Sequence, residues 1–372
     1  MEKIGIYIHI PFCAKKCPYC DFYSVGYHKG LAEEYVRALT ADMERYRGKG
    51  IAADTLYFGG GTPSLIPPEM IARLTETAEE CFGLENAEIT LEANPNTISS
   101  QRISAFRRAG INRISLGMQS SEQRELEALG RSHTASRAAQ AVETAYEGGI
   151  SNISLDVMLG TPGQTRESIL HTLEFAVSLP VSHLSAYLLK VEPETAYWNS
   201  PILKECADEQ EQADIYLETV SFLEQHGFGQ YEISNFAKPG KESRHNLKYW
   251  RCEEYLGFGP AAHSYFGGKR YGNPRDIAGY IAAPGRNARV TDEAPGDPEE
   301  KVMLGLRLTE GVPLEWFGEL PEGEYGKLIR ECGLLENAGY LSLAQGKITL
   351  TPKGFLLSNT VIAELLRYLP EQ

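Results

Sequence analysis

The chain has 372 residues, and its 36 Lys and Arg residues against 50 Asp and Glu residues give a formal charge of −14. A chain this acidic is not expected to be a general binder of nucleic acids or other polyanions. No stretch approaches the roughly 18 consecutive apolar residues of a membrane span, and His9 and Pro11 interrupt the start too early for a signal peptide. At roughly 150 residues per domain, we expect one large domain and a smaller one, in the cytoplasm.

Up to about residue 230, short β-rich apolar stretches alternate with longer stretches of helical periodicity. Strands are predicted at Lys3–Ile10, Asp54–Phe58, Glu88–Ala93, Arg113–Met118, Asn152–Met158 and His183–Leu188. Helices are predicted near Leu31–Arg47, Pro68–Phe82, Ser99–Ala109, Ala135–Tyr146 and Thr165–Val177. Strands joined by crossover helices pair in parallel. Six such units predict an α/β fold with a partial (β/α)6 barrel of the TIM type, rather than an open doubly wound sheet.

Three of the seven cysteines, Cys13, Cys17 and Cys20, form a C-x3-C-x2-C loop directly after the first predicted strand. An odd number of cysteines in a large chain is poor material for a disulfide framework, and the neighbouring Lys15 and Lys16 favour thiolates. A structural zinc site needs four closed ligands, so His9 or a distant residue would have to complete it. An iron–sulfur cube normally takes four cysteines. Three cysteines would leave one iron of the cube free to bind a small molecule. The residues alone are compatible with both a zinc site and an iron–sulfur cluster.

Polar groups also follow the next predicted strands. Gly59-Gly60-Gly61-Thr62 ends the second strand, Glu92 the third, Gln119 the fourth, and Asp156 lies in the fifth. Taken singly, the glycines could form a tight turn, and each carboxylate could be a helix cap or a satisfied buried group. Functional groups of parallel barrels gather at the carboxyl ends of the strands. Together these groups predict one shared polar ligand, such as a zwitterion that carries a ribose.

The second half begins with a long predicted helix at Asp208–Gln225, followed by an aromatic, glycine-rich region. The segment 284–298, rich in Pro, Gly and charge, resembles a linker. The last 70 or so residues predict a mainly helical, winged-helix-like module. From residue 291 onward there are 14 acidic and 7 basic residues, net −7, so we do not expect this module to contact DNA. The predicted units are 1–235, 236–290 and 291–372.

The motifs together resemble the radical S-adenosylmethionine (SAM) superfamily, over nearly the whole chain. The branch that contains oxygen-independent coproporphyrinogen III oxidase is the most similar. The resemblance is carried by Tyr7-Ile-His-Ile-Pro-Phe-Cys13, Gly59–Ser64, Leu91-Glu92-Ala-Asn-Pro95, Leu116-Gly-Met-Gln-Ser120 and Gly130-Arg131-x-His133.

This resemblance implies a [4Fe-4S] cluster on Cys13, Cys17 and Cys20, with SAM bound to the fourth iron. It implies SAM contacts from Tyr7, Gly60, Gly61, Thr62, Glu92, Gln119, Arg131 and Asp156. Tyr19 is expected to pack against the cluster or the ligand. An electron from a donor such as flavodoxin or ferredoxin would cleave SAM to a 5′-deoxyadenosyl radical, with the protein supplying orientation and exclusion of water.

Two departures separate the chain from the oxidase pattern and match the HemW-type haem chaperones of the same branch. Phe22 stands where the oxidase has a further cysteine, and only 12 residues precede Cys13. The chain also has the His-Asn-x-x-Tyr-Trp motif of that group, which begins at His245. The resemblance implies a protein that binds haem and passes it to an acceptor protein. It makes coproporphyrinogen III oxidase activity improbable and leaves SAM cleavage open.

His245 is the first candidate for the haem ligand, because a histidine among aromatic rings can ligate haem iron. His263 and Cys252 are alternative ligands. From the residues alone, the other interpretation is an aromatic packing cluster in which His245 is hydrogen-bonded. Two functions compete with haem transfer: a radical reaction on a tetrapyrrole, and a zinc module without catalysis.

Overall fold

The centre of the fold is six parallel strands in one sheet, as described by a computed structural model that covers residues 3–318, 320 and 322–369. The strands are β1 (Ile4–Ile10), β4 (Ala53–Gly60), β5 (Glu88–Ala93), β6 (Arg113–Gln119), β7 (Asn152–Leu159) and β8 (His183–Leu188). They lie side by side in chain order. Because β1 and β8 do not pair, the barrel is open. The predicted α/β fold with a partial (β/α)6 barrel is confirmed, and each strand lies within two residues of its predicted bounds.

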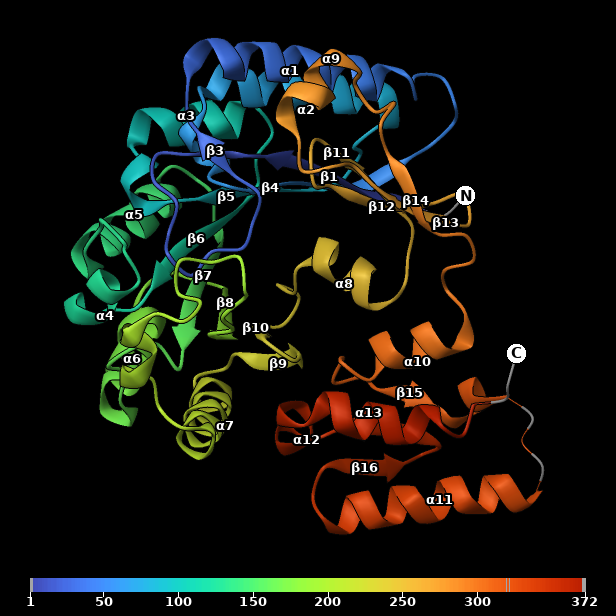
Figure 1. Ribbon diagram of the computed structural model, residues 1–372. Coiled ribbons are helices and arrows are strands. Elements are labelled where there is room, and N and C mark those ends of the chain that lie inside the picture. Colours follow the sequence, from blue (N-terminus) through green and yellow to red (C-terminus); the bar gives the residue numbers. More distant parts are fainter. Residues whose placement is uncertain (1–2, 319, 321, 370–372) are drawn as a thin grey trace.

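Helices cover the outer face of this curved sheet (Figure 1). They are α1 (Lys29–Glu44), α2 (Pro68–Phe82), α3 (Ser100–Arg108), α4 (Gln123–Ala128), α5 (Ala135–Glu147), α6 (Arg166–Ser178) and α7 (Glu209–Gln225). The short helix α4 was not predicted, because six residues give no clear helical period.

The two faces of each parallel strand carry different kinds of side chain. Alternate residues on β1 (Ile4, Ile6, Ile8 and Ile10) are buried in the apolar core. The residues between them belong to the concave face, where Tyr7 aligns with Tyr57 of β4, and Gly117 of β6 aligns with Asp156 of β7. Successive side chains of a strand point to opposite faces. The concave face is therefore lined by polar and aromatic groups, while the helix side holds the core.

Six further strands extend the sheet at both edges. On one side lie β11 (Tyr255–Phe258), β12 (His263–Phe266), β13 (Lys269–Gly272) and β14 (Arg289–Asp292), and on the other β10 (Asn235–Ala237) and β9 (Gly229–Glu232). Strand β11 pairs in parallel with β1, so the aromatic region returns to the barrel. The predicted linker at 284–298 was wrong in part, because Arg289–Asp292 forms an edge strand that pairs with β13.

Two short helices accompany these strands. Helix α8 (Arg244–Trp250), which carries the His245 motif, lies on the concave side of the sheet (Figure 1). Helix α9 (Ile277–Ala282) packs against α1. A two-stranded pair, β2 (Phe12–Cys13) and β3 (Val25–Gly26), closes the base of the cysteine loop.

The carboxyl-terminal region is mainly helical, as predicted. Its helices are α10 (Pro298–Gly305), α11 (Glu322–Asn337), α12 (Pro352–Leu356) and α13 (Ser358–Leu366), with a small sheet of β15 (Val312–Pro313), β16 (Leu341–Ala344) and β17 (Lys347–Leu350). It attaches to the barrel beside β9, where the Thr309 amide donates to the Tyr231 carbonyl oxygen at 3.1 Å. Within the described ranges, no helix is long and apolar enough to cross a membrane.

Candidate functional site

A cavity of about 360 Å³ opens at the carboxyl ends of the parallel strands. Eleven of the thirteen predicted site residues line it: Cys13, Cys17, Cys20, Tyr19, Gly60, Gly61, Thr62, Glu92, Gln119, Arg131 and Asp156. Tyr7 and His245 do not. These residues come from four parallel strands, the cysteine loop and the segment after α4, up to 143 positions apart in sequence. They line one cavity, as expected of groups at the carboxyl ends of barrel strands.

The cysteine loop is fixed at both of its ends. The Val25 amide donates to the Pro11 carbonyl oxygen at 2.7 Å, and the Tyr27 amide donates to the Cys13 carbonyl oxygen at 3.1 Å. Inside the loop, the Cys20 amide donates to the Cys17 carbonyl oxygen at 3.2 Å. These three backbone hydrogen bonds fix the conformation of the loop whose three thiols line the cavity.

The three thiols interact with one another and with Arg131. Burial raises the pKa of Cys20, and the charges of Cys17 and Cys13 raise it further, while Lys16 lowers it. Arg131 Nη1 lies 3.6 Å from Cys17 Sγ, and Thr62 Oγ1 lies 3.7 Å from Cys13 Sγ. Across the part of the chain that the structure describes, no three His, Cys, Asp or Glu side chains surround a single metal position.

Two glycines bring separate segments close together at this end of the barrel. Gly60 has φ +111°, and a Cβ there would lie 2.5 Å from the His9 ring. Gly130 has φ +67°, and its Cβ would lie 2.7 Å from Pro18 of the cysteine loop. Residues with a side chain avoid this backbone region. Gly130 thus lets the next residue, Arg131, approach Cys17, and Gly60 lets β4 end against β1.

Two carboxyl groups in the cavity wall are held at unusual pKa values. Burial raises the pKa of Glu92 to about 7, although Tyr57 donates to its Oε1 at 2.9 Å and the Gly60 amide to its Oε2 at 3.1 Å. Burial likewise raises the pKa of Asp156 to about 6, against a hydrogen bond from Ser115 at 3.0 Å. Carboxylates that are short of positive partners suit a ligand with a cationic centre or hydroxyl groups.

Two further residues in the cavity wall, Arg131 and Gln119, have features typical of a binding site. Arg131 donates through Nη2 to the Gly117 carbonyl oxygen at 2.7 Å, but within the described residues its buried Nε has no acceptor. Gln119 ends β6 at φ +74°, a left-handed conformation that is uncommon for a residue with a side chain. Backbone strain of this kind concentrates at binding sites, where the surrounding structure enforces it.

Tyr7 lies one layer below the cavity. Its hydroxyl is hydrogen-bonded to His9 Nδ1 at 3.0 Å, and its ring is stacked near that of Tyr57, with centroids 6.2 Å apart. Tyr57 in turn carries the hydroxyl that donates to Glu92. Tyr7 therefore supports the groups that line the cavity without lining it.

His245 lies deeper still, at the amino ends of the strands. It is 1% exposed, and both ring nitrogens have partners: Nδ1 with Thr55 Oγ1 at 2.7 Å and Nε2 with the Tyr249 hydroxyl at 2.8 Å. Its ring stacks on Tyr57 with centroids 5.1 Å apart. This is the packing arrangement that the residues alone suggested. Direct ligation of haem iron by His245 would require one of these hydrogen bonds to break.

The two alternative haem ligands lie outside the cavity as well. His263 begins strand β12 and is exposed. Cys252 has φ +55°, and its Sγ lies 3.7 Å from both Arg270 and Glu300, whose side chains form an ion pair at 3.0 Å.

The cavity also includes residues that were not among the predicted site residues: Lys15, Lys16, Phe22, Tyr57, Ala93, Asn94, Ser115, Gly117, Met158 and Tyr187. Several of them, such as Ser115, Gly117 and Tyr187, occupy concave-face positions of strands whose other face is apolar. The two-residue alternation within the predicted strands was the signal that could have found them.

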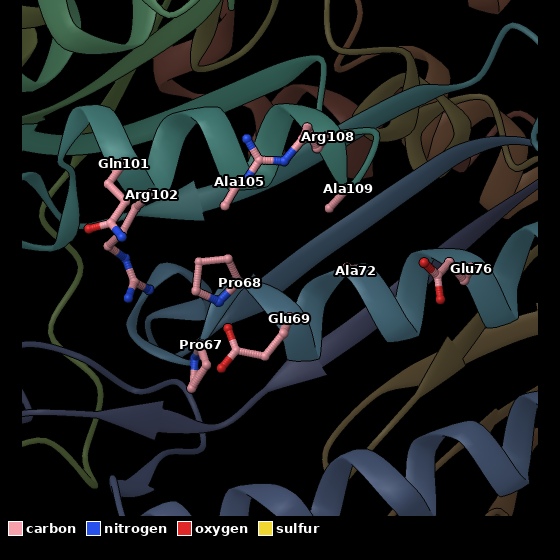
Figure 2. Close-up of a pocket in the computed structure, with 10 residues that line it drawn as sticks. All are labelled: Pro67, Pro68, Glu69, Ala72, Glu76, Gln101, Arg102, Ala105, Arg108 and Ala109. Atoms are coloured by element: carbon pink, nitrogen blue, oxygen red, sulfur yellow. The ribbon is translucent and has the colours of Figure 1, made fainter.

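A second hollow lies on the outside of the barrel, between α2 and α3. It has a volume of about 660 Å³ and is lined by Pro67, Pro68, Glu69, Ala72, Glu76, Gln101, Arg102, Ala105, Arg108 and Ala109 (Figure 2). Arg102 at its edge already donates to the carbonyl oxygens of Ser64 and Ile66, at 2.5 and 2.7 Å. It contains none of the cysteines, and we therefore assign the site to the smaller cavity.

Comparison with known proteins gives consistent family matches. A model of the radical SAM superfamily matches residues 7–176, and a model of the HemN C-terminal domain matches residues 296–357. The heme chaperone HemW of Bacillus subtilis is 37% identical, with 97% of this chain and 98% of that protein covered. The heme chaperone HemW of Escherichia coli is 36% identical, over 84% of this chain and 85% of that protein.

Among solved structures, coproporphyrinogen III oxidase (HemN) from Escherichia coli has the same fold. The TM-score is 0.83 at 23% sequence identity, with 99% of this chain and 91% of that chain covered.

Proposed function

Since this chain belongs to the radical SAM superfamily and, within it, to the HemW family, we propose that it is a cytoplasmic haem chaperone. It would bind a [4Fe-4S] cluster, SAM and haem, and pass haem to an acceptor protein. The observation that carries the proposal is the cavity lined both by three thiols and by two buried carboxyl groups, Glu92 and Asp156, whose pKa values burial raises. All seven cysteines are free thiols, which suits a reducing compartment.

The donor set fits an iron–sulfur cluster with one open corner. Cys13, Cys17 and Cys20 supply three thiolates along one wall of the cavity, and each can take one iron of a cube. The guanidinium of Arg131, beside Cys17, offsets part of their negative charge. When bound, the cluster would supply an iron site for the amino and carboxylate groups of SAM and an electron for its cleavage.

The rest of the cavity fits a zwitterion that carries a nucleoside. Its volume of about 360 Å³ is near the lower end of the range for ligand pockets, roughly 300–1,000 Å³. Glu92 and Asp156 would accept hydrogen bonds from hydroxyl groups or attract a cationic centre. Gln119 and Thr62 offer further polar contacts. Tyr57 donates to Glu92 and is itself stacked near Tyr7, which fixes the position of the carboxyl group.

The haem part of the proposal comes from the relatives, which are named heme chaperones. The test is anaerobic reconstitution with iron and sulfide, followed by titration with SAM and haemin and by transfer of haem to an apo-haem protein. We expect comparable amounts of iron and sulfide, a new Soret band, and its shift to the spectrum of the acceptor. Zinc without sulfide would contradict the cluster, and no transfer after binding would contradict the chaperone function.

The second candidate is a radical reaction on a tetrapyrrole, which the shared fold with the oxidase favours. Phe22, at the position of a further cysteine in the oxidase pattern, counts against it. An assay for protoporphyrinogen formation with SAM and a reduced flavodoxin or ferredoxin decides between the two, since only the enzyme forms this product.

A further inference from the structure

The most exposed large hydrophobic side chain in the described part of the chain lies at the site itself. Phe22 is 66% exposed and lines the cavity two residues after Cys20. A second aromatic side chain of the cavity, Tyr187 at the end of β8, is 41% exposed. Scattered exposed apolar residues are normal, but exposed aromatic rings at the opening of a polar cavity mark a surface that a ligand covers.

The exposure of Phe22 belongs to a fixed loop. The next residue, Tyr23, accepts a hydrogen bond through its carbonyl oxygen from His9 Nε2 at 2.9 Å. The Tyr23 hydroxyl accepts another from the Ile277 amide at 3.0 Å. Both contacts anchor the segment beside Phe22 to the barrel, so its ring is presented in a defined place and does not collapse onto the core.

Two lysines add positive charge to the same opening. Lys15 and Lys16 are exposed and line the cavity, and among the described residues neither forms an ion pair. The one carboxylate next to Phe22, Asp21, is paired with Arg275 at 3.3 Å. On a chain of net charge −14, unpaired lysines beside an exposed phenylalanine favour a ligand that is flat, apolar and carries carboxylates.

The inside of the cavity does not suit such a ligand. SAM, as proposed above, would fill its volume of about 360 Å³. Its wall also presents the carboxyl groups of Glu92 and Asp156, which disfavour further carboxylates nearby. The alternative position at His245 is closed, because that side chain is 1% exposed with both ring nitrogens hydrogen-bonded.

We propose, on the basis of the function proposed above, that haem docks on the opening of the cavity. The macrocycle lies on Phe22 and Tyr187, and its two propionates lie at Lys15 and Lys16. Haem would then cover the cluster and SAM from the solvent side, and its binding would need no iron ligand from His245. Phe22 is therefore a specificity-determining residue, since a polar residue in its place removes the apolar platform.

The test is a haemin titration of cluster-loaded protein carrying Phe22→Ser or the pair Lys15→Ala and Lys16→Ala. Loss of one buried aromatic contact should weaken binding about tenfold, and loss of the lysines should weaken it several-fold, most at low salt. Tyr325→Ser, at a 47% exposed aromatic elsewhere, and the pair Lys238→Ala and Lys241→Ala are matched controls that should bind like the parent. Iron and sulfide are measured in each variant, because Phe22 is close to Cys20.

Two probes separate this surface from an axial ligand. Metal-free protoporphyrin IX should bind nearly as well as haemin, and haemin dimethyl ester should bind the parent as weakly as haemin binds the double lysine variant. The proposal is overturned if metal-free porphyrin does not bind while haemin does, or if Phe22→Ser binds normally and His245→Ala does not. Failure of haemin to bind the parent protein at all would instead refute the proposed function.

Discussion

The two ends of the barrel are built from the same strands but differ in how well their polar groups are satisfied. At the carboxyl end, Glu92 and Asp156 have raised pKa values and Arg131 Nε has no acceptor among the described residues. At the amino end, His245 has partners at both ring nitrogens, and the Lys248 ammonium lies 3.0 Å from Asp54 and 2.9 Å from Glu253.

This difference separates binding from stability. Buried polar groups that lack partners cost free energy, and at the carboxyl end a bound ligand can supply the missing partners. Groups with all partners present stabilise the fold. The His-Asn-x-x-Tyr-Trp segment, which the sequence predicted as a haem-ligand site, therefore has the fully paired contacts of a closed end of the barrel.

The largest effect is expected from the cluster ligands. Replacing Cys17 by Ala removes one of the three thiolates, and two cysteines are not expected to retain a [4Fe-4S] cluster. The iron and sulfide content should therefore fall to background after reconstitution. Cys206→Ala is the control, because Cys206 is also a partly buried free thiol but lies outside the cavity. Equal iron and sulfide in both variants would contradict the assignment of the carboxyl end as the cluster site.

The second prediction concerns the amino end. His245→Ala removes a buried ring and leaves Thr55 and Tyr249 without their partner. Truncation of a large buried side chain costs about 3 kcal/mol or more, and we expect a loss of about this size in the free energy of unfolding, measured by urea denaturation. Cluster content should be unchanged in the protein that remains folded. If His245→Ala has the same free energy of unfolding as the parent protein, the amino end of the barrel is not the closed end.

The third prediction uses the pH dependence of the carboxyl end. Glu92 has a folded pKa of about 7 against an ordinary value of 4.5, so the folded state holds this proton more tightly than the unfolded state. The contribution is fully present below pH 4.5 and is lost as the pH rises to 7. Glu92→Gln, which stays neutral, should therefore raise the free energy of unfolding at pH 8 by about 2 kcal/mol in SAM-free protein.

The matched measurement for this variant is unfolding at pH 5, where Glu92 of the folded state is protonated and the gain should fall to a small fraction of its value at pH 8. Substitution at His245 should cost stability at both pH values, because the pKa of that ring is lowered to about 3 and it is neutral throughout. A gain for Glu92→Gln that is equal at pH 5 and pH 8 would contradict the raised pKa. SAM binding should weaken in the same variant, which would show that the destabilising group is kept for a ligand.

The parallel strands and the cavity were predictable from the sequence because they depend on local patterns. Alternating isoleucines fix β1, and residues that follow parallel strands necessarily meet at one edge. The place of His245 was not predictable, because it depends on β11 pairing with β1 from 250 residues away. That pairing carries α8 to the concave side, and no local signal encodes it. The edge strand β14 was missed for the same reason: all four of its residues are exposed, so it lacks an apolar pattern.

The smallest expected effect tests the contact between the two ends. Tyr57 stacks on His245 and donates its hydroxyl to Glu92. Tyr57→Phe keeps the ring and removes a hydrogen bond that lowers the pKa of Glu92, so this pKa should rise further. Since the bond is stronger to the charged carboxylate, the variant should lose about 1 kcal/mol of stability at pH 8 and almost none at pH 5, measured by urea unfolding. An equal loss at both pH values would mean that Tyr57 belongs only to the closed end, whereas a loss confined to pH 8 would show that one side chain takes part in both.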